Sequence, residues 1–243
     1  MEISPIAFFS SPFKTKFGIP RQSGIVEDVV GEVVFEKQYQ SPEAVRGLQG
    51  FDYIWLIWGF TNPAQSPVEE DGGQRDYTDA QRHKHTLPLT VRPPRLGGNE
   101  RVGVFASRSP FRPNSLALSS VRLLAVETGK LIVAGADLMD GTPIYDIKPY
   151  VPFSDCHVGA AAGFVDQNTW KTLDVIFPEP LRTLFSHDEQ NAIIAALSQD
   201  PRPQYHASSQ RVYGMPFASY DIRFTVTDDV VTITEVKPLT PAD

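Results

Sequence analysis

The sequence predicts a mainly β protein, a barrel or a sandwich, with a small α+β appendage at its C-terminal end. Many short runs of β-branched and aromatic residues are separated by turn residues, and few segments have a helical period. No glycine-rich turn joins a strand to a helix in the spacing that a Rossmann sheet requires. With 243 residues, of which 41% are hydrophobic and 21% are charged, the chain can bury a substantial core.

Short strands are expected throughout the first 150 residues. They are predicted at residues 2–9, 31–39, 51–60, 102–106, 116–127, 131–137 and 144–147. Thr128-Gly129 and Asp140-Gly141 provide turns between the later strands. One short helix is predicted at residues 41–47, because Ser41 can cap it, Pro42 suits its first position and Gly47 can end it.

The organisation changes after Pro152. A strand is predicted at residues 173–177, and a helix follows the capping-box spacing of Ser186 and Glu189. Two more strands are predicted at residues 218–226 and 230–236. We therefore predict a β-barrel or sandwich domain at residues 1–175 and a small α+β subdomain at residues 176–243.

Composition places the chain among cytoplasmic proteins. No apolar run approaches the roughly 18 residues of a membrane span, and the first residues lack the pattern of a secretion signal. Cys156 is the only cysteine, which excludes an internal disulfide and agrees with a reducing compartment. His83 and His85 lie in a polar stretch without a third ligand at helical spacing, so no metal is expected.

Charge is distributed unevenly along the chain. The net charge of −7 argues against a general nucleic-acid coat. Residues 82–112, however, contain seven basic side chains and the single acid Glu100, so one basic face is expected. The polar residues 62–88 show no sustained period and predict a long loop, of a length that is usually functional or disordered.

Four segments combine irregular backbone with charged or aromatic side chains. They are residues 11–24, 91–99, 107–115 and 137–150. Prolines beside the arginines of the second and third segments stiffen the backbone, which suits recognition of carboxylate or phosphate groups. Ordinary solvated loops, and a simple turn at Asp140-Gly141, remain the alternative interpretation.

Taken together, these segments resemble the TsaA-like family, also called YaeB or TrmO. The resemblance runs from Ser-Pro-Phe-Lys-x-Lys-Phe at residues 11–17 and Pro-Arg-Gln at residues 20–22 to residues 44–48, 90–99, 108–114 and 140–150. It implies a single-sheet β-barrel that forms a homodimer, binds S-adenosylmethionine and methylates N6 of threonylcarbamoyladenosine at position 37 of tRNA, beside the anticodon.

The resemblance also implies which residues form the site. The cofactor residues would be Ser23, Gly24, Ile25, Thr61, Asn62, Arg108, Leu118, Asp137, Leu138, Met139 and Asp140. The catalytic residues, which would surround the adenosine that accepts the methyl group, would be Arg112, Asn114, Asp146, Lys148 and Tyr150. Asp146 would be the proton acceptor. Phosphate contacts to tRNA would come from Arg92 and Arg95.

Two other functions stay open at this point. One is a methyltransferase of the same fold that acts on a small molecule, which the net acidic charge favours. The other is a noncatalytic RNA-binding or partner-binding barrel, because a fold does not guarantee an activity.

Overall fold

The computed structural model describes residues 2–60, 89–93, 100–168, 171–202 and 211–239, which belong to two compact units. The first unit comprises Met1–Trp58, Leu118–Ala160 and Trp170–Asp243, and the second comprises Gly59–Ala117 and Ala161–Thr169. The predicted loop at residues 62–88 lies outside the described residues.

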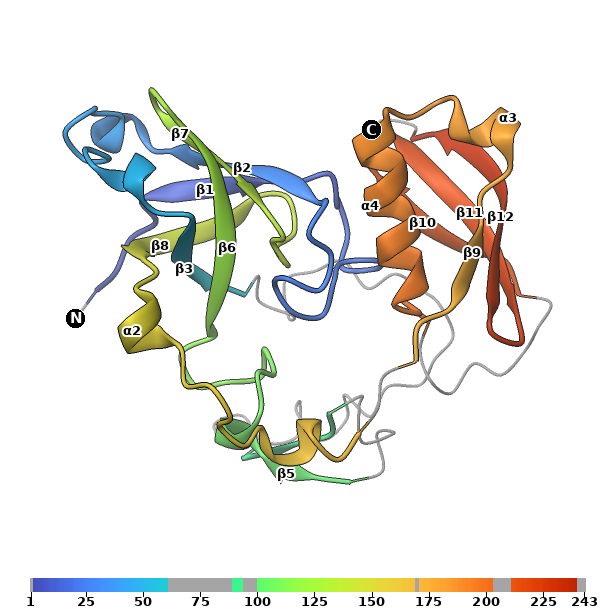
Figure 1. Ribbon diagram of the computed structural model, residues 1–243, viewed down its shortest axis with the longest axis horizontal. Helices are drawn as coiled ribbons and strands as arrows, with labels where there is room; N and C mark the ends of the chain where they lie inside the picture. The colour runs from blue at the N-terminus through green and yellow to red at the C-terminus, as the bar shows by residue number, and fades with distance from the viewer. Residues whose placement is uncertain (1, 61–88, 94–99, 169–170, 203–210, 240–243) are drawn as a thin grey trace. The chain divides into compact units, whose positions relative to one another are not determined.

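Six strands form a closed barrel in the order β1-β2-β7-β6-β3-β8 (Figure 1). The strands are β1 (Ala7–Ser10), β2 (Val30–Phe35), β3 (Tyr53–Gly59), β6 (Leu116–Glu127), β7 (Lys130–Ala134) and β8 (Thr142–Pro149). Antiparallel pairing of β1 with both β2 and β8 closes the sheet on itself, so the barrel has no free edge along β1. The predicted mainly β fold is confirmed.

Alternating burial along the strands fills the barrel. On β3, Ile54, Leu56 and Trp58 are buried, whereas the residues between them are only partly covered. Leu131 and Val133 on β7 are fully buried in the same alternating pattern. Because successive side chains of a strand point to opposite faces, this period of two gives each strand one core face.

A second sheet, with the order β10-β11-β12-β9, forms the C-terminal part of the first unit (Figure 1). Its strands are β9 (Asp174–Ile176), β10 (Tyr213–Phe217), β11 (Tyr220–Thr227) and β12 (Val230–Pro238), and β9 runs parallel to β12. Helix α4 (His187–Ser198) contacts β9 and buries Ile193 and Leu197. The predicted capping box is present, since Ser186 Oγ accepts from Glu189 N and the Glu189 carboxylate accepts from Ser186 N.

The remaining elements are short. They are β4 (Thr90–Val91), β5 (Val102–Gly103), α2 (Pro152–Asp155), α3 (Glu179–Arg182) and the 3-10 helices η1 (Lys37–Tyr39), η2 (Leu48–Gly50), η4 (Val104–Ala106) and η5 (Gly163–Val165). Within the described segments, no helix has the length and apolar character needed to cross a bilayer.

Some predicted elements were wrong in detail: the strand predicted at residues 2–9 begins only at Ala7, and the one predicted at residues 31–39 ends at Phe35. Residues 41–47 form consecutive turns with three-residue spacing, as in the bond from Ala44 N to Ser41 O, and only η2 follows them. Gly47 adopts a φ of 86°, a left-handed conformation that breaks the helical path. The strand expected at residues 102–106 ends after Gly103 and continues as η4.

Strand β10 was not predicted, and its Gly214 and Pro216 are residue types that disfavour strands. The sheet order places β10 at an edge, where a proline does not remove a hydrogen bond from a central ladder. Gly214 lies beside the Asp221 carboxylate, and a Cβ there would be 2.7 Å from its Oδ1. The position of β10 in the sheet therefore explains why a glycine and a proline are tolerated within this strand.

Gly31 offers a test of packing on the barrel wall. A Cβ at this position would lie 2.4 Å from Phe9 Cζ and 2.9 Å from the Ser10 carbonyl oxygen. We expect Gly31→Ala to lower the free energy of unfolding by about 1–3 kcal/mol, the usual cost of overpacking. The control is Gly50→Ala, where a Cβ meets nothing within 4 Å. Urea denaturation measures both variants, and equal midpoints would refute the packing argument.

Candidate functional site

Two of the four predicted segments, residues 11–24 and the start of residues 137–150, meet at one end of the barrel. The register pairs Ser10 with Glu32, Phe9 with Thr142 and Val30 with Ala134. The connections that leave β1, enter β2, leave β7 and enter β8 therefore all emerge from the same end. These connections contain residues 11–29 and 135–141, which include most of the cofactor residues predicted in the first unit.

Asp140 ties two of these connections together. Its Oδ1 accepts a hydrogen bond of 3.0 Å from Ser11 N, and its Oδ2 lies 2.9 Å from Lys14 Nζ. The Asp140 amide in turn donates to Phe13 O at 2.9 Å. Because both side chains of the ion pair are partly exposed, its main effect is to fix geometry and its contribution to stability is small. The carboxylate of Asp140 thus positions the loop after β1.

A pair of glycines brings residues 23–25 against the turn after β7. Gly24 N donates to Gly135 O at 2.9 Å, and a Cβ on Gly135 would lie 3.6 Å from Gly24 N. Both residues have positive φ, 79° and 77°, which glycine adopts without steric cost. The predicted segment Ser23-Gly24-Ile25 therefore lies beside the connection from β7 to β8, which also contains the predicted segment Asp137-Leu138-Met139-Asp140.

A buried hydrogen-bond chain fixes Asp137. Trp58 Nε1 donates to Ser119 Oγ at 2.9 Å, and Ser119 Oγ donates to Asp137 Oδ1 at 2.6 Å. Leu118 precedes Ser119 on β6 and is 51% exposed, on the opposite face of that strand. Leu138 is only 1% exposed, so this residue belongs to the core of the barrel end. Ser119 was not predicted as a site residue, because the sequence gives no sign that it bonds to Asp137.

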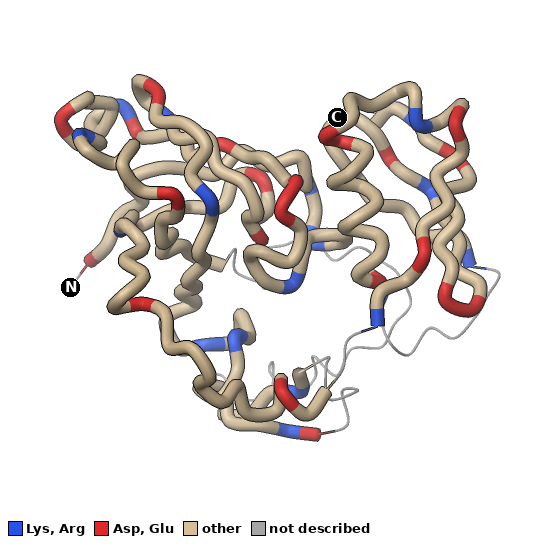
Figure 2. Tube along the Cα trace, viewed as in Figure 1, with Lys and Arg blue, Asp and Glu red and all other residues tan. Residues whose placement is uncertain are grey.

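The predicted segment at residues 107–115, here called the arginine loop, lies in the second unit. Arg112 Nη1 donates to Ser107 O at 2.7 Å, so this guanidinium braces its own loop, whereas Asn114 and Arg108 are exposed. Thr61, Asn62 and Arg95 lie outside the described residues. The described part of this unit contains Arg92, Arg101, Arg108 and Arg112 against Glu100 and Asp166, a basic excess on an otherwise acidic chain (Figure 2).

The acceptor residues predicted on and just after β8 form two contacts on the barrel wall. Lys148 Nζ lies 2.9 Å from Asp146 Oδ2, and both side chains are exposed. The Tyr150 ring lies 5.7 Å from the Trp55 ring, between centroids. Burial, followed by the charge and hydrogen bond of Cys156, raises the pKa of Tyr150 above its usual value. Tyr150 is therefore protonated at neutral pH and is a hydrogen-bond donor, not a base.

Asp155 is a second residue that the sequence did not reveal. Its Oδ2 accepts from Val151 N at 2.9 Å and from Trp55 Nε1 at 2.8 Å. The Val151 amide and then the Trp55 indole lower the pKa of Asp155 below its usual value. Trp55 precedes Asp155 by 100 positions, so no local pattern could have paired them.

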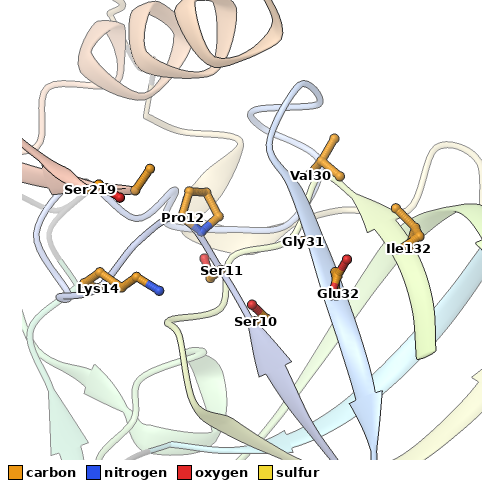
Figure 3. A pocket seen from close by; sticks show the side chains of 10 residues that line it. Ser10, Ser11, Pro12, Lys14, Val30, Gly31, Glu32, Ile132 and Ser219 are labelled. Atoms are coloured by element: carbon orange, nitrogen blue, oxygen red, sulfur yellow. The ribbon is translucent and has the colours of Figure 1, made fainter. Parts of the chain in front are cut away.

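A cavity of about 390 Å³ lies beside this end of the barrel, between β2 and the turn that joins β10 to β11 (Figure 3). Its lining includes Ser11, Lys14, Glu32 and Ser219. The predicted cofactor residues do not line it, although Lys14 links it to Asp140. Among the described residues, histidine, cysteine and acidic side chains form no group of three or more that could hold a metal ion.

Family models account for both parts of the chain. Residues 8–156 match the tRNA-methyltransferase O N-terminal domain, and residues 171–239 match the TrmO C-terminal domain. The chain belongs to the tRNA-methyltransferase O family. The family predicted from the sequence is thereby confirmed.

Individual proteins of the family are similar over most of the chain. The tRNA (adenine(37)-N6)-methyltransferase of Escherichia coli K12 is 34% identical over 249 residues, with 98% of each chain covered. A Pyrococcus abyssi protein described as a "probable S-adenosyl-L-methionine-binding protein" is 30% identical, with 69% of this chain and 77% of the relative covered. A crystal structure of TrmO from Pseudomonas aeruginosa superposes with a TM-score of 0.73 at 27% identity, covering 98% of both chains.

The lowered pKa of Asp155 predicts a pH-dependent contribution to stability. The folded state favours the carboxylate, so the stabilisation is present above the unfolded value of 3.8 and is lost as the pH falls through the lower folded pKa. Asp155→Asn should therefore be less stable than the unaltered protein at pH 7, and this difference should shrink towards pH 3. Urea denaturation at both pH values measures it, and a difference that does not change with pH would contradict the assignment.

Proposed function

We propose that this chain is an S-adenosylmethionine-dependent methyltransferase that modifies N6 of threonylcarbamoyladenosine at position 37 of tRNA. The observation that carries the proposal is the hydrogen bond from Gly24 to Gly135, which brings Ser23-Gly24-Ile25 beside the connection that contains Asp137 to Asp140. Family membership and the name of the Escherichia coli relative support the reaction class and the position of the base. Residues 1–175 would form the cofactor-binding barrel and residues 176–243 the appended subdomain.

The residues at this end of the barrel fit the chemical groups of S-adenosylmethionine. Gly24 has positive φ and no heavy atom near its missing Cβ, so its backbone is accessible to a ligand. Ile25 provides apolar surface, and the Asp137 carboxylate provides an anion beside a positively charged donor. In our proposal the backbone of Met139 contacts the adenine, and the buried Leu138 fixes that backbone. The family resemblance further assigns Arg108, Thr61 and Asn62 to the cofactor, with Arg108 as the partner of its carboxylate.

The cofactor supplies a methyl group on a positively charged sulfur, so the protein needs no covalent nucleophile. The protein must align the acceptor nitrogen with that methyl group and exclude water. Tyr150 can orient the acceptor base as a hydrogen-bond donor, because its raised pKa keeps it protonated. Asp146, already paired with Lys148, is proposed as the proton acceptor. The family resemblance also assigns Arg112 and Asn114 to the acceptor side.

The proposed substrate surface includes the basic part of the second unit. Arg92 is exposed at the end of the β4 strand, and Arg95 follows it in the sequence. Guanidinium groups bind phosphate by paired hydrogen bonds, so these residues suit the backbone of the anticodon stem-loop. A local basic surface on an acidic protein favours a defined RNA contact over general nucleic-acid binding.

We also propose that the protein is a cytoplasmic homodimer. Leu118 and Leu124 on β6 are 51% and 45% exposed, and Tyr53 on the neighbouring strand β3 is 43% exposed. These apolar side chains lie on outward-facing positions of adjacent strands, where a partner would cover them.

Nucleoside analysis of tRNA tests the proposed function. After incubation with S-adenosylmethionine, tRNA that contains threonylcarbamoyladenosine should gain one methyl group, detected by mass spectrometry on that nucleoside. Control tRNA with unmodified adenosine at position 37 should gain none. Methylation of both substrates would show a broader tRNA specificity, and methylation of neither would exclude the proposed reaction and favour a small-molecule acceptor or a noncatalytic barrel.

A further inference from the structure

Residues 12–29, here called the bridging segment, connect β1 to β2 and contribute to the core of the C-terminal sheet. Phe13, Val26 and Val29 are almost completely buried, and they belong to the same hydrophobic cluster as the inward face of that sheet. Phe13 packs edge-on against Phe217 of β10, with 5.4 Å between ring centroids. Part of the barrel's own connection is therefore core of the C-terminal sheet.

Aromatic stacking strengthens this attachment. The ring of Phe17 stacks on Tyr213 and Phe224, at 6.4 Å and 6.2 Å between centroids. Ala218 N donates to Pro12 O at 2.7 Å, so backbone pairing adds to the ring contacts. Aromatic pairs at this distance contribute more than their buried area alone.

Met215 packs against the bridging segment at Gly18. A Cβ at Gly18 would lie 2.4 Å from Met215 Sδ, and Gly18 has a φ of 90°. Met215 is fully buried on β10. The sheet therefore contacts Gly18 where only a glycine fits.

The other side of the bridging segment faces the proposed cofactor site. Gly24 N bonds to Gly135 O, and Phe13 O accepts from Asp140 N. Ile25 packs against the same cluster as Met215. One short segment thus contacts the C-terminal core and the turn from Asp137 to Asp140 at once.

We propose that Met215 is a positioning residue for cofactor binding, acting through the bridging segment. The inference rests on the proposed function, because it assumes that Ser23-Gly24-Ile25 contacts S-adenosylmethionine. A loop that is already ordered binds its ligand more tightly, since binding does not have to supply the free energy of ordering. The C-terminal sheet provides that order without touching the cofactor.

Three variants separate positioning from general stability. Met215→Ala removes the contact with Gly18, and we expect about tenfold weaker binding of S-adenosylmethionine. Met215→Leu keeps the volume and should bind within about twofold of the unaltered protein. Val231→Ala is the matched control, because Val231 is equally buried but lies on β12, opposite Val175 of β9. It should lower the melting temperature while leaving cofactor affinity close to that of the unaltered protein.

Calorimetric titration gives the affinities, and thermal melts confirm that each variant is folded. Hydrogen exchange without cofactor gives a second readout, in which the Gly24 amide should exchange faster in Met215→Ala but not in Val231→Ala. Phe17→Ala, at a half-buried residue of the bridging segment, should reproduce both effects.

Unchanged Gly24 exchange and unchanged affinity in Met215→Ala would overturn the positioning role. Equal loss of affinity in Met215→Ala and Val231→Ala would also overturn it, since general destabilisation would then be sufficient. Faster Gly24 exchange in Met215→Ala, with no cofactor binding by the unaltered protein, would support the structural coupling and contradict the proposed function.

Discussion

The carboxylate of Asp140 is the contact on which the candidate site depends. It accepts from Ser11 N and pairs with Lys14, so it holds the connection after β1 against the connection before β8. Neither connection is regular structure, and neither would keep one conformation without such contacts. The hydrogen bond from Gly24 N to Gly135 O holds the later part of the same loop, which returns towards β2. An irregular region thereby gains a fixed geometry from a few polar bonds.

Closure of the barrel explains why these connections meet. In a closed antiparallel sheet, β1 neighbours both β2 and β8, so the loops of distant sequence positions emerge side by side. Residues 11–29 then have two neighbours, the turn from Asp137 to Asp140 and the C-terminal sheet. In our proposal this arrangement takes the place of the glycine-rich turn of a dinucleotide-binding sheet, and the cofactor is held by loop backbone and a few side chains.

The sequence predicted what local pattern determines. The bounds of β6 agree with the prediction, and the capping box of α4 forms as Ser186 and Glu189 indicated, because both signals act over a few residues. Strand β10 was missed because its edge position, which tolerates Pro216, is a property of the sheet. The bonds of Asp155 to Trp55 and of Ser119 to Asp137 were also missed, since each joins residues from different elements. The family resemblance indicated the candidate residues, whereas the contacts of Asp140 with Ser11 and Lys14 and the burial of Phe13, Val26 and Val29 came only from the fold.

The central claim is that S-adenosylmethionine binds where Ser23-Gly24-Ile25 meets the turn from Asp137 to Asp140. A crystal structure of the protein with S-adenosylmethionine tests it most directly. The account predicts cofactor density in contact with both segments, with the contacts of Asp140 to Ser11 N and Lys14 Nζ intact. Cofactor density confined to the cavity of Ser10, Glu32 and Ser219, away from both segments, would contradict it.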